Sequence, residues 1–156
     1  MSNFCARAWG ARHEERGSSA VEFALVVPVL LLIAFGLIQY GLYFWAMQGG
    51  SDLARSAARL SAVGDPARCT DFRSRVSGEI SHFQGARGVP TVQRTYSKGP
   101  GNTGTGVEVG DVVTVTISFK SIDLGMPLIP FLDGGVVTQS AEARVEYAPT
   151  QPEPCP

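Results

Sequence analysis

Glu22 lies at the edge of a long uncharged segment, where its carboxylate calls for a partner charge. No formal charge occurs in the 25 residues from Phe23 to Met47, and Gln39 is the only side-chain amide among them. An ionised carboxylate at a lipid boundary is costly unless a cation pairs with it. Ser19 and Glu22 also have the spacing of a capping box, whose side chains satisfy backbone N–H groups at a helix start. We therefore expect a helix to begin near Ser19.

Three cysteines allow one disulfide in an oxidising compartment. Cys5 precedes the uncharged segment, whereas Cys69 and Cys155 both follow it. A Cys69–Cys155 bond would close a loop of about 86 residues and stabilise the fold by about 3–5 kcal/mol. Two free thiols are the alternative. Together with His82 these cysteines lack the spacing of a zinc site, so neither a metal nor another cofactor is expected.

Catalytic motifs are missing from the sequence. The part after the uncharged segment has one histidine, two lysines and scattered acids, with no nucleophile elbow, phosphate loop or close carboxylate pair. We expect a protein that is not an enzyme. The formal net charge of −1 and the absence of a basic patch also argue against binding to nucleic acid.

The uncharged segment has the length of a membrane-spanning helix, since a bilayer core takes about 20 helical residues. A cleaved secretory signal peptide is the alternative, but its apolar region would be about 7–15 residues. Three arginines precede the segment and two follow it closely, which favours a cytoplasmic N-terminus. Pro28 is expected to kink or open the helix, unless it is a tolerated proline near the helix start. The segment closes on aromatic residues typical of a membrane interface: Tyr40, Tyr43, Phe44 and Trp45.

Beyond the span, the pattern predicts an outer helix and then a second one. Gly49-Gly50 is interpreted as a flexible joint, because glycine disfavours helix. A helical extension over residues 49–64 follows, with an apolar stripe of Leu53, Ala57, Leu60 and Val63. Asp65 as N-cap and Pro66 as first residue predict a second helix over 66–84. Its expected core residues are Phe72, Val76, Ile80 and Phe83.

After Phe83 the apolar period changes from helical to alternating, which predicts strands. The expected fold class is α+β: a long N-terminal membrane-spanning helix extended into an outer helix, a second helix, and then a small antiparallel β-sheet ectodomain. An apolar loop with two prolines between the last strands either covers the sheet or contacts a partner. The expected segments are strands at 89–97, 107–120 and 137–147, a Gly-rich loop at 98–106, the apolar loop at 125–135 and an extended Pro-rich tail at 148–156.

The residues around Gly17 carry a family resemblance. Gly17, four residues, then Glu22-Phe23 and an apolar helix resemble the class III signal of type IV pilin-like proteins, which a prepilin peptidase cleaves after the glycine. More narrowly, the run from Arg16 to Pro28 resembles the TadE-like family, minor pseudopilins of tight-adherence (Flp) pilus assembly systems. The resemblance covers about residues 16–62 and departs from the family at Ser56 and Ala57, where an acid and a glycine are usual.

The resemblance implies a division of the chain and a set of roles. Residues 1–17 would be a cleaved cytoplasmic leader, 18–48 the transmembrane helix, 49–64 its extension and 65–156 a small α+β ectodomain. Cleavage between Gly17 and Ser18 would give Glu22 an α-amino partner on the same or a neighbouring copy, with Phe23 and Pro28 in the assembly segment.

The implied function is that of a non-catalytic minor pseudopilin that assembles, primes or caps a pilus. It would lie in the inner membrane with its C-terminal domain periplasmic or extracellular. Its partners would be membrane lipid, a prepilin peptidase, other pilin or pseudopilin subunits and the pilus assembly platform. The alternative is a single-pass anchor that displays a small binding domain unrelated to pili.

Overall fold

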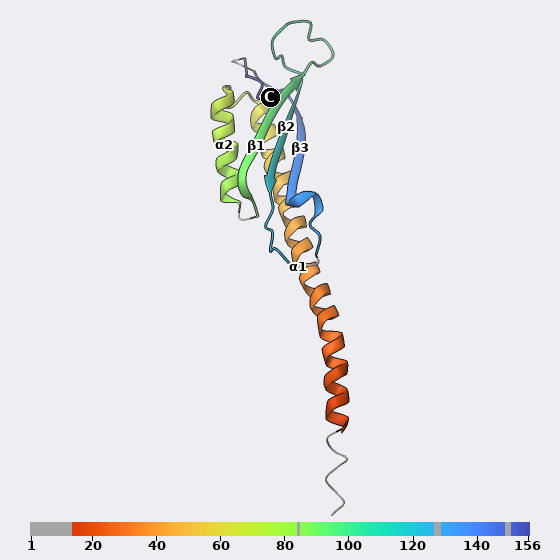
Figure 1. Cartoon of the computed structure of the whole chain (residues 1–156). Coiled ribbons are helices and arrows are strands. Elements are labelled where there is room, and N and C mark those ends of the chain that lie inside the picture. The colour runs from red at the N-terminus through yellow and green to blue at the C-terminus, as the bar shows by residue number, and fades with distance from the viewer. Residues whose placement is uncertain (1–13, 84, 127–128, 149–150) are drawn as a thin grey trace, which may run out of the picture.

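The computed structural model describes residues 14–83, 85–126, 129–148 and 151–156. Helix α1 (Glu14–Ala62) extends far beyond the rest of the fold, and its C-terminal half packs on the ectodomain (Figure 1). Helix α2 (Cys69–His82) and strands β1 (Arg87–Ser97), β2 (Val112–Lys120) and β3 (Val136–Arg144) follow, with a 3-10 turn, η1 (Leu132–Gly135), before β3. The expected α+β class is confirmed.

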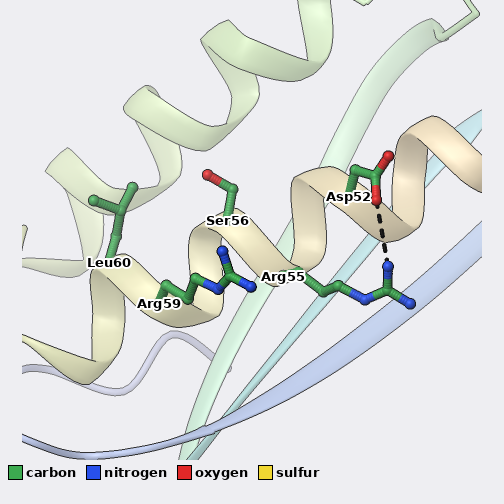
Figure 2. Close-up of a pocket in the computed structure, with 5 residues that line it drawn as sticks. All are labelled: Asp52, Arg55, Ser56, Arg59 and Leu60. Carbon is green, nitrogen blue, oxygen red and sulfur yellow. Dashed lines mark hydrogen bonds and ion pairs between the residues drawn. The ribbon is translucent and has the colours of Figure 1, made fainter.

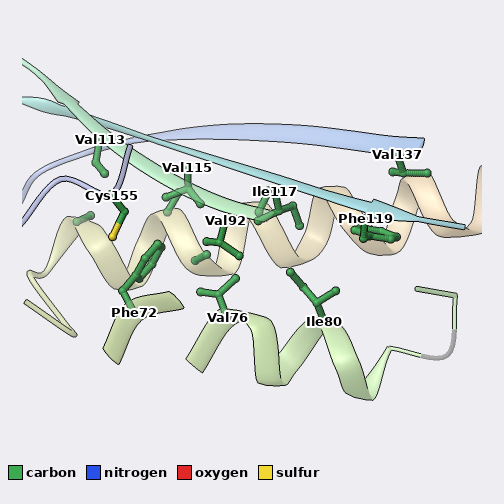
Figure 3. Close-up of a cluster of buried hydrophobic side chains, with 14 of the residues drawn as sticks. Phe72, Val76, Ile80, Val92, Val113, Val115, Ile117, Phe119, Val137 and Cys155 are labelled. Carbon is green, nitrogen blue, oxygen red and sulfur yellow. The ribbon is translucent and has the colours of Figure 1, made fainter. Parts of the chain in front are cut away.

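The three strands form an antiparallel sheet in the order β1-β2-β3. Ile117 in the central strand pairs with Val92 of β1 and with Gln139 of β3. Residues of β2 alternate between buried and half-buried because successive side chains point to opposite faces. Both helices cover the apolar face, and Figure 3 shows the side chains that fill the space: Phe72, Val76, Ile80, Val92, Val113, Val115, Ile117, Phe119, Val137 and Cys155.

Small residues bring α1 close to the sheet. The predicted stripe of Leu53, Ala57, Leu60 and Val63 is only partly correct, because Leu53 and Leu60 are half-buried and Val63 is exposed. The fully covered positions instead have short side chains and lie along one face of the helix, so the helix approaches β2 and β3 closely. They are Ala46, Gly50, Ala54, Ala57, Ala58 and Ser61.

Helix α1 continues through Gly49 and Gly50, where a flexible joint was expected. A Cβ atom at Gly49 would lie 2.4 Å from Cζ of Phe83, and one at Gly50 would lie 3.0 Å from Cε1 of Phe119. The Phe83 ring also packs against that of Trp45, with 5.1 Å between ring centroids and a tilt of 53°. The two glycines thus provide room for the rings of Phe83, the C-cap of α2, and of Phe119 in β2.

Helix α2 begins at Cys69, three residues later than predicted. Asp65 and Pro66 do not start it, and Arg68 is the N-cap. The carbonyls of Pro66 and Ala67 accept hydrogen bonds from the side chain of Arg94 at 2.8 and 2.9 Å. These residues form a loop because their backbone is used in tertiary contacts.

Strand β2 also begins later than predicted, at Val112 and not at Val107. The buried carboxylate of Asp111 organises the preceding loop by accepting hydrogen bonds from the N–H groups of Gly99 at 2.8 Å and Glu108 at 2.9 Å, and from the amide of Asn102 at 2.7 Å. These bonds, with the charge of Lys98, lower the pKa of Asp111 against the opposing effect of burial.

Candidate membrane and assembly site

The N-terminal half of α1 stands alone, without cover from the ectodomain (Figure 1). Among the described residues, only the helix over Gly17–Ala62 is long and apolar enough to cross a membrane. Its most apolar 18 residues have a mean hydropathy of 2.7, and none of them is buried against the rest of the described structure. Large apolar side chains such as Phe23, Leu30 and Leu37 face outward. Apolar surface on this scale needs lipid or other helices around it.

Gly17 and Ser18 lie inside the first turns of α1, which begins at Glu14. The predicted capping box at Ser19 and Glu22 is therefore wrong for the uncut chain, because the helix already starts five residues before Ser19 and the N–H groups there lie within it. The other leader residues, 1–13, lie outside the described part of the chain. Gly17 is exposed, and no described atom beyond its own part of the helix lies within 4 Å of a Cβ built on it.

Glu22 lies exposed on α1, four residues after Ser18. Residues four apart are neighbours on a helix surface, and side chains lean toward the N-terminus of their helix. We therefore expect the carboxylate of Glu22 to lean back toward Ser18. An α-amino group at Ser18 would lie one turn away, on the same helix or on one packed beside it.

Pro28 is exposed and lies within the continuous helix. The expected opening does not interrupt α1, although Pro28 has no N–H to donate to the carbonyl of Ala24. Phe23 and Pro28 are brought onto the same uncovered segment as Glu22. The predicted assembly residues Glu22, Phe23 and Pro28 thus share one exposed helical segment.

Gln39, Tyr40 and Tyr43 mark the point at which α1 meets the ectodomain. The side chain of Gln39 is only 2% exposed and bonds the backbone of the β2–β3 connection, donating to the carbonyl of Ile122 at 3.1 Å and accepting from the N–H of Leu124 at 3.0 Å. The hydroxyl of Tyr40 donates to the carbonyl of Pro130 at 2.8 Å. In the sequence, the signal for this contact was Gln39 itself, because it is the only side-chain amide in the uncharged segment.

A shallow hollow of about 460 Å³ lies farther along α1. Figure 2 shows its lining residues, all from α1: Asp52, Arg55, Ser56, Arg59 and Leu60. Arg55 donates to Asp52 at 3.3 Å, and both side chains are exposed. An exposed ion pair of this kind contributes little to stability, so these charges remain available to a neighbouring surface.

The predicted Cys69–Cys155 disulfide is present, with 5.4 Å between the Cα atoms. It joins the start of α2 to the C-terminal tail, whose residues Pro149 and Thr150 lie outside the described part of the chain. Cys155 also pairs with Arg94 as an antiparallel bridge, with backbone bonds of 2.8 and 2.7 Å. The tail therefore adds a short edge contact to β1.

Arg94 is a buried residue that the sequence interpretation missed. Its guanidinium is fully covered, donates to the carbonyls of Pro66, Ala67 and Glu153, and lies 4.3 Å from the ring centroid of Phe72. Burial lowers the pKa of Arg94, and the charges of Tyr96 and Glu153 oppose this shift. The sequence signal was its position in the strand: Arg94 lies two residues from Val92 and two from Tyr96, so all three point to the same inward face.

Together, the exposed apolar helix and the small ectodomain with its disulfide fit a single-pass membrane protein of the α+β class. Residues 17–59 match the model of the TadE-like protein family, just over a quarter of the chain. The match confirms the resemblance seen in the sequence and indicates a pilus-associated subunit. It runs from Gly17 through the span to Arg59, and α2 and the sheet lie beyond it. No curated protein and no solved structure matches the chain.

Proposed function

We propose that this chain is a non-catalytic minor pseudopilin of a tight-adherence pilus, cleaved after Gly17 by a prepilin peptidase. The observation that carries the proposal is the register of Gly17 and Glu22 on an uncovered apolar helix within the TadE-like match. The chain inserts with its leader in the cytoplasm and its ectodomain on the far side of the inner membrane. There it assembles, primes or caps the filament with other pilin-like subunits and the assembly platform.

Cleavage supplies the positive charge that can pair with the carboxylate of Glu22. The new ammonium of Ser18 lies one helical turn from the carboxylate, on the same copy or on an adjacent one. Pairing is favourable at a lipid border because an isolated charge there is costly. Lateral packing of uncovered helices then buries the apolar segment, so assembly is driven by helix packing in the bilayer.

The hydrogen bonds of three buried polar side chains support a non-catalytic role. The side chains of Gln39, Arg94 and Asp111 all form hydrogen bonds to backbone groups and hold loops in place. A catalytic group must instead be free to reach a substrate. A single-pass anchor with an unrelated binding domain is the competing proposal, since α2 and the sheet lie beyond the family match.

Intact-mass measurement and N-terminal sequencing of chain extracted from membranes that contain the prepilin peptidase test the proposal. The native chain should begin at Ser18, and Gly17→Ala should keep its leader because the residue before the cut has changed. Gly36→Ala is the matched control, since Gly36 lies in the same helix with open space around it in the described structure. It should be cleaved normally.

Glu22→Gln in the same membranes separates cleavage from pairing. It keeps the shape of the side chain and removes its charge, so it should be cleaved but recovered less in crosslinks to pilin subunits. Native chain that still begins at Met1 would support the unrelated anchor. Cleaved Glu22→Gln with unchanged crosslinking would contradict the pairing role.

A further inference from the structure

The connection between β2 and β3 reaches back along α1 toward the membrane. It descends beside the helix to a lower level than the turn between α2 and β1 (Figure 1). Both limbs of the connection are fastened to the helix, one through Gln39 and the other through Tyr40 and Pro130. The ring of Tyr43 also meets that of Phe131 edge-on, with 5.8 Å between centroids. The loop therefore has a fixed height on α1.

That height falls at the outer edge of the bilayer core. With Glu22 at the inner edge, a core of about 30 Å at 1.5 Å per residue reaches about 20 residues farther, to Leu42. Gln39 lies about 26 Å above Glu22 on this scale. In lipid every polar group needs a protein partner. The two bonds from Gln39 to the loop backbone meet that need at this level.

The loop presents apolar side chains where lipid would be. Leu124 is 41% exposed, and Ile122, Met126 and Ile129 are each half-buried. Asp123 is the only charged residue from 121 to 131, and its carboxylate accepts the N–H of Gly125 at 2.8 Å. On α1, the aromatic side chains of Phe44 and Trp45, which follow Leu42 closely, are also exposed. Such aromatic residues are typical of membrane interfaces.

We propose that the described residues of the β2–β3 connection, 122–126 and 129–131, form an interfacial loop that enters the outer headgroup and upper acyl region of the membrane spanned by α1. The occupant of this apolar surface is lipid, because the loop is tied to the lipid-facing helix at the height of the bilayer edge. The loop gives the ectodomain a second contact with the membrane. This inference rests on the membrane insertion stated above, and its test separates the two.

Single-tryptophan variants of the full chain, reconstituted in phosphatidylcholine liposomes with brominated acyl chains, measure the depth of each site. Trp9→Phe with Trp45→Phe provides the background, to which Leu124→Trp, Leu30→Trp or Val109→Trp is added. Leu30 lies in the span, and Val109 is 69% exposed in the β1–β2 connection, at the far end of the sheet from the membrane. Leu124→Trp should show a blue-shifted emission that bromines near the headgroup quench. Val109→Trp should be quenched by aqueous acrylamide alone.

Each other outcome is decisive. If Leu30→Trp is quenched by deep bromines but Leu124→Trp behaves like Val109→Trp, the loop proposal fails and the anchor stands. Unquenched Leu30→Trp would overturn both. Protection of Leu124→Trp from bromine and acrylamide would show a protein partner, such as a second copy, and would overturn lipid contact. Nonreducing electrophoresis checks that each variant retains its disulfide, and Ile129→Trp replaces any loop variant that does not.

Discussion

Gly49→Ala tests whether the glycine pair of α1 provides space for aromatic rings or a flexible joint. If Gly49 were only a flexible joint in the helix, replacing it by alanine would stabilise the fold by about 0.8–1.0 kcal/mol through helix propensity. The structure predicts the opposite contribution from packing. The added methyl would lie 2.4 Å from Cζ of Phe83, whereas carbon atoms in favourable contact are about 3.5–4.0 Å apart.

The Phe83 ring has little room to move away. A Cβ atom on Gly85 would lie 2.5 Å from the same Cζ, and the rings of Trp45 and Phe119 are 5.1 and 6.1 Å from it between centroids. Overpacking of this kind costs about 1–3 kcal/mol. After the gain in helix propensity, we expect Gly49→Ala to be neutral to about 2 kcal/mol less stable than the native chain.

Gly78→Ala is the matched control, because Gly78 lies inside α2 with open space around it in the described structure. It should gain about 0.5–1 kcal/mol. Thermal unfolding of the full chain in detergent micelles, followed by near-ultraviolet circular dichroism, measures both variants. The expected difference between them is about 1–3 kcal/mol, a few degrees in Tm. Equal stabilisation of both variants would refute the packing argument and would support the interpretation of Gly49 as a flexible joint.

Two further predictions concern buried polar groups outside the membrane. Arg94→Leu should lower the free energy of unfolding by about 2–6 kcal/mol, because the carbonyls of Pro66 and Glu153 lose their donors. Urea unfolding in micelles measures this free energy, with Arg144→Leu as the control because Arg144 is exposed. A loss of stability no larger than that of Arg144→Leu would contradict the prediction. The lowered pKa of Asp111 means that its contribution is complete above the ordinary carboxyl pKa near 4 and is lost as the pH falls through the lower folded value. Asp111→Asn should flatten the fall in urea midpoint over that acidic range, and an unchanged slope would refute the assignment.

The elements were predictable where apolar spacing alone decides them. Phe72, Val76 and Ile80 repeat at helical spacing and are buried in α2, and the alternation around Val115 gives the central strand. The disulfide was predictable because two cysteines follow the span. These features depend on local periodicity or on a residue count, both of which the sequence states directly.

Element ends and buried polar contacts could not be predicted in the same way. Pro66 has the ideal type for a helix start, but its carbonyl is taken by Arg94, which is 28 positions away in sequence. The β2 boundary depends on Asp111, whose partners are separate loop residues. Likewise, the low helix propensity of Gly49 predicts a flexible joint, and its contact with Phe83 could not be foreseen because Phe83 is distant in sequence. Long-range contacts override local preference at each of these positions.

The unbroken course of α1 from its exposed apolar segment into the core fixes the ectodomain in rotational phase with the membrane helix. Each helical residue turns by about 100° and rises about 1.5 Å. A one-residue insertion between Phe23 and Ile38 would therefore swing the sheet about a quarter turn around the helix axis and lift it only slightly. The number of residues in the span thus sets which side of the ectodomain lies above a given face of the membrane helix.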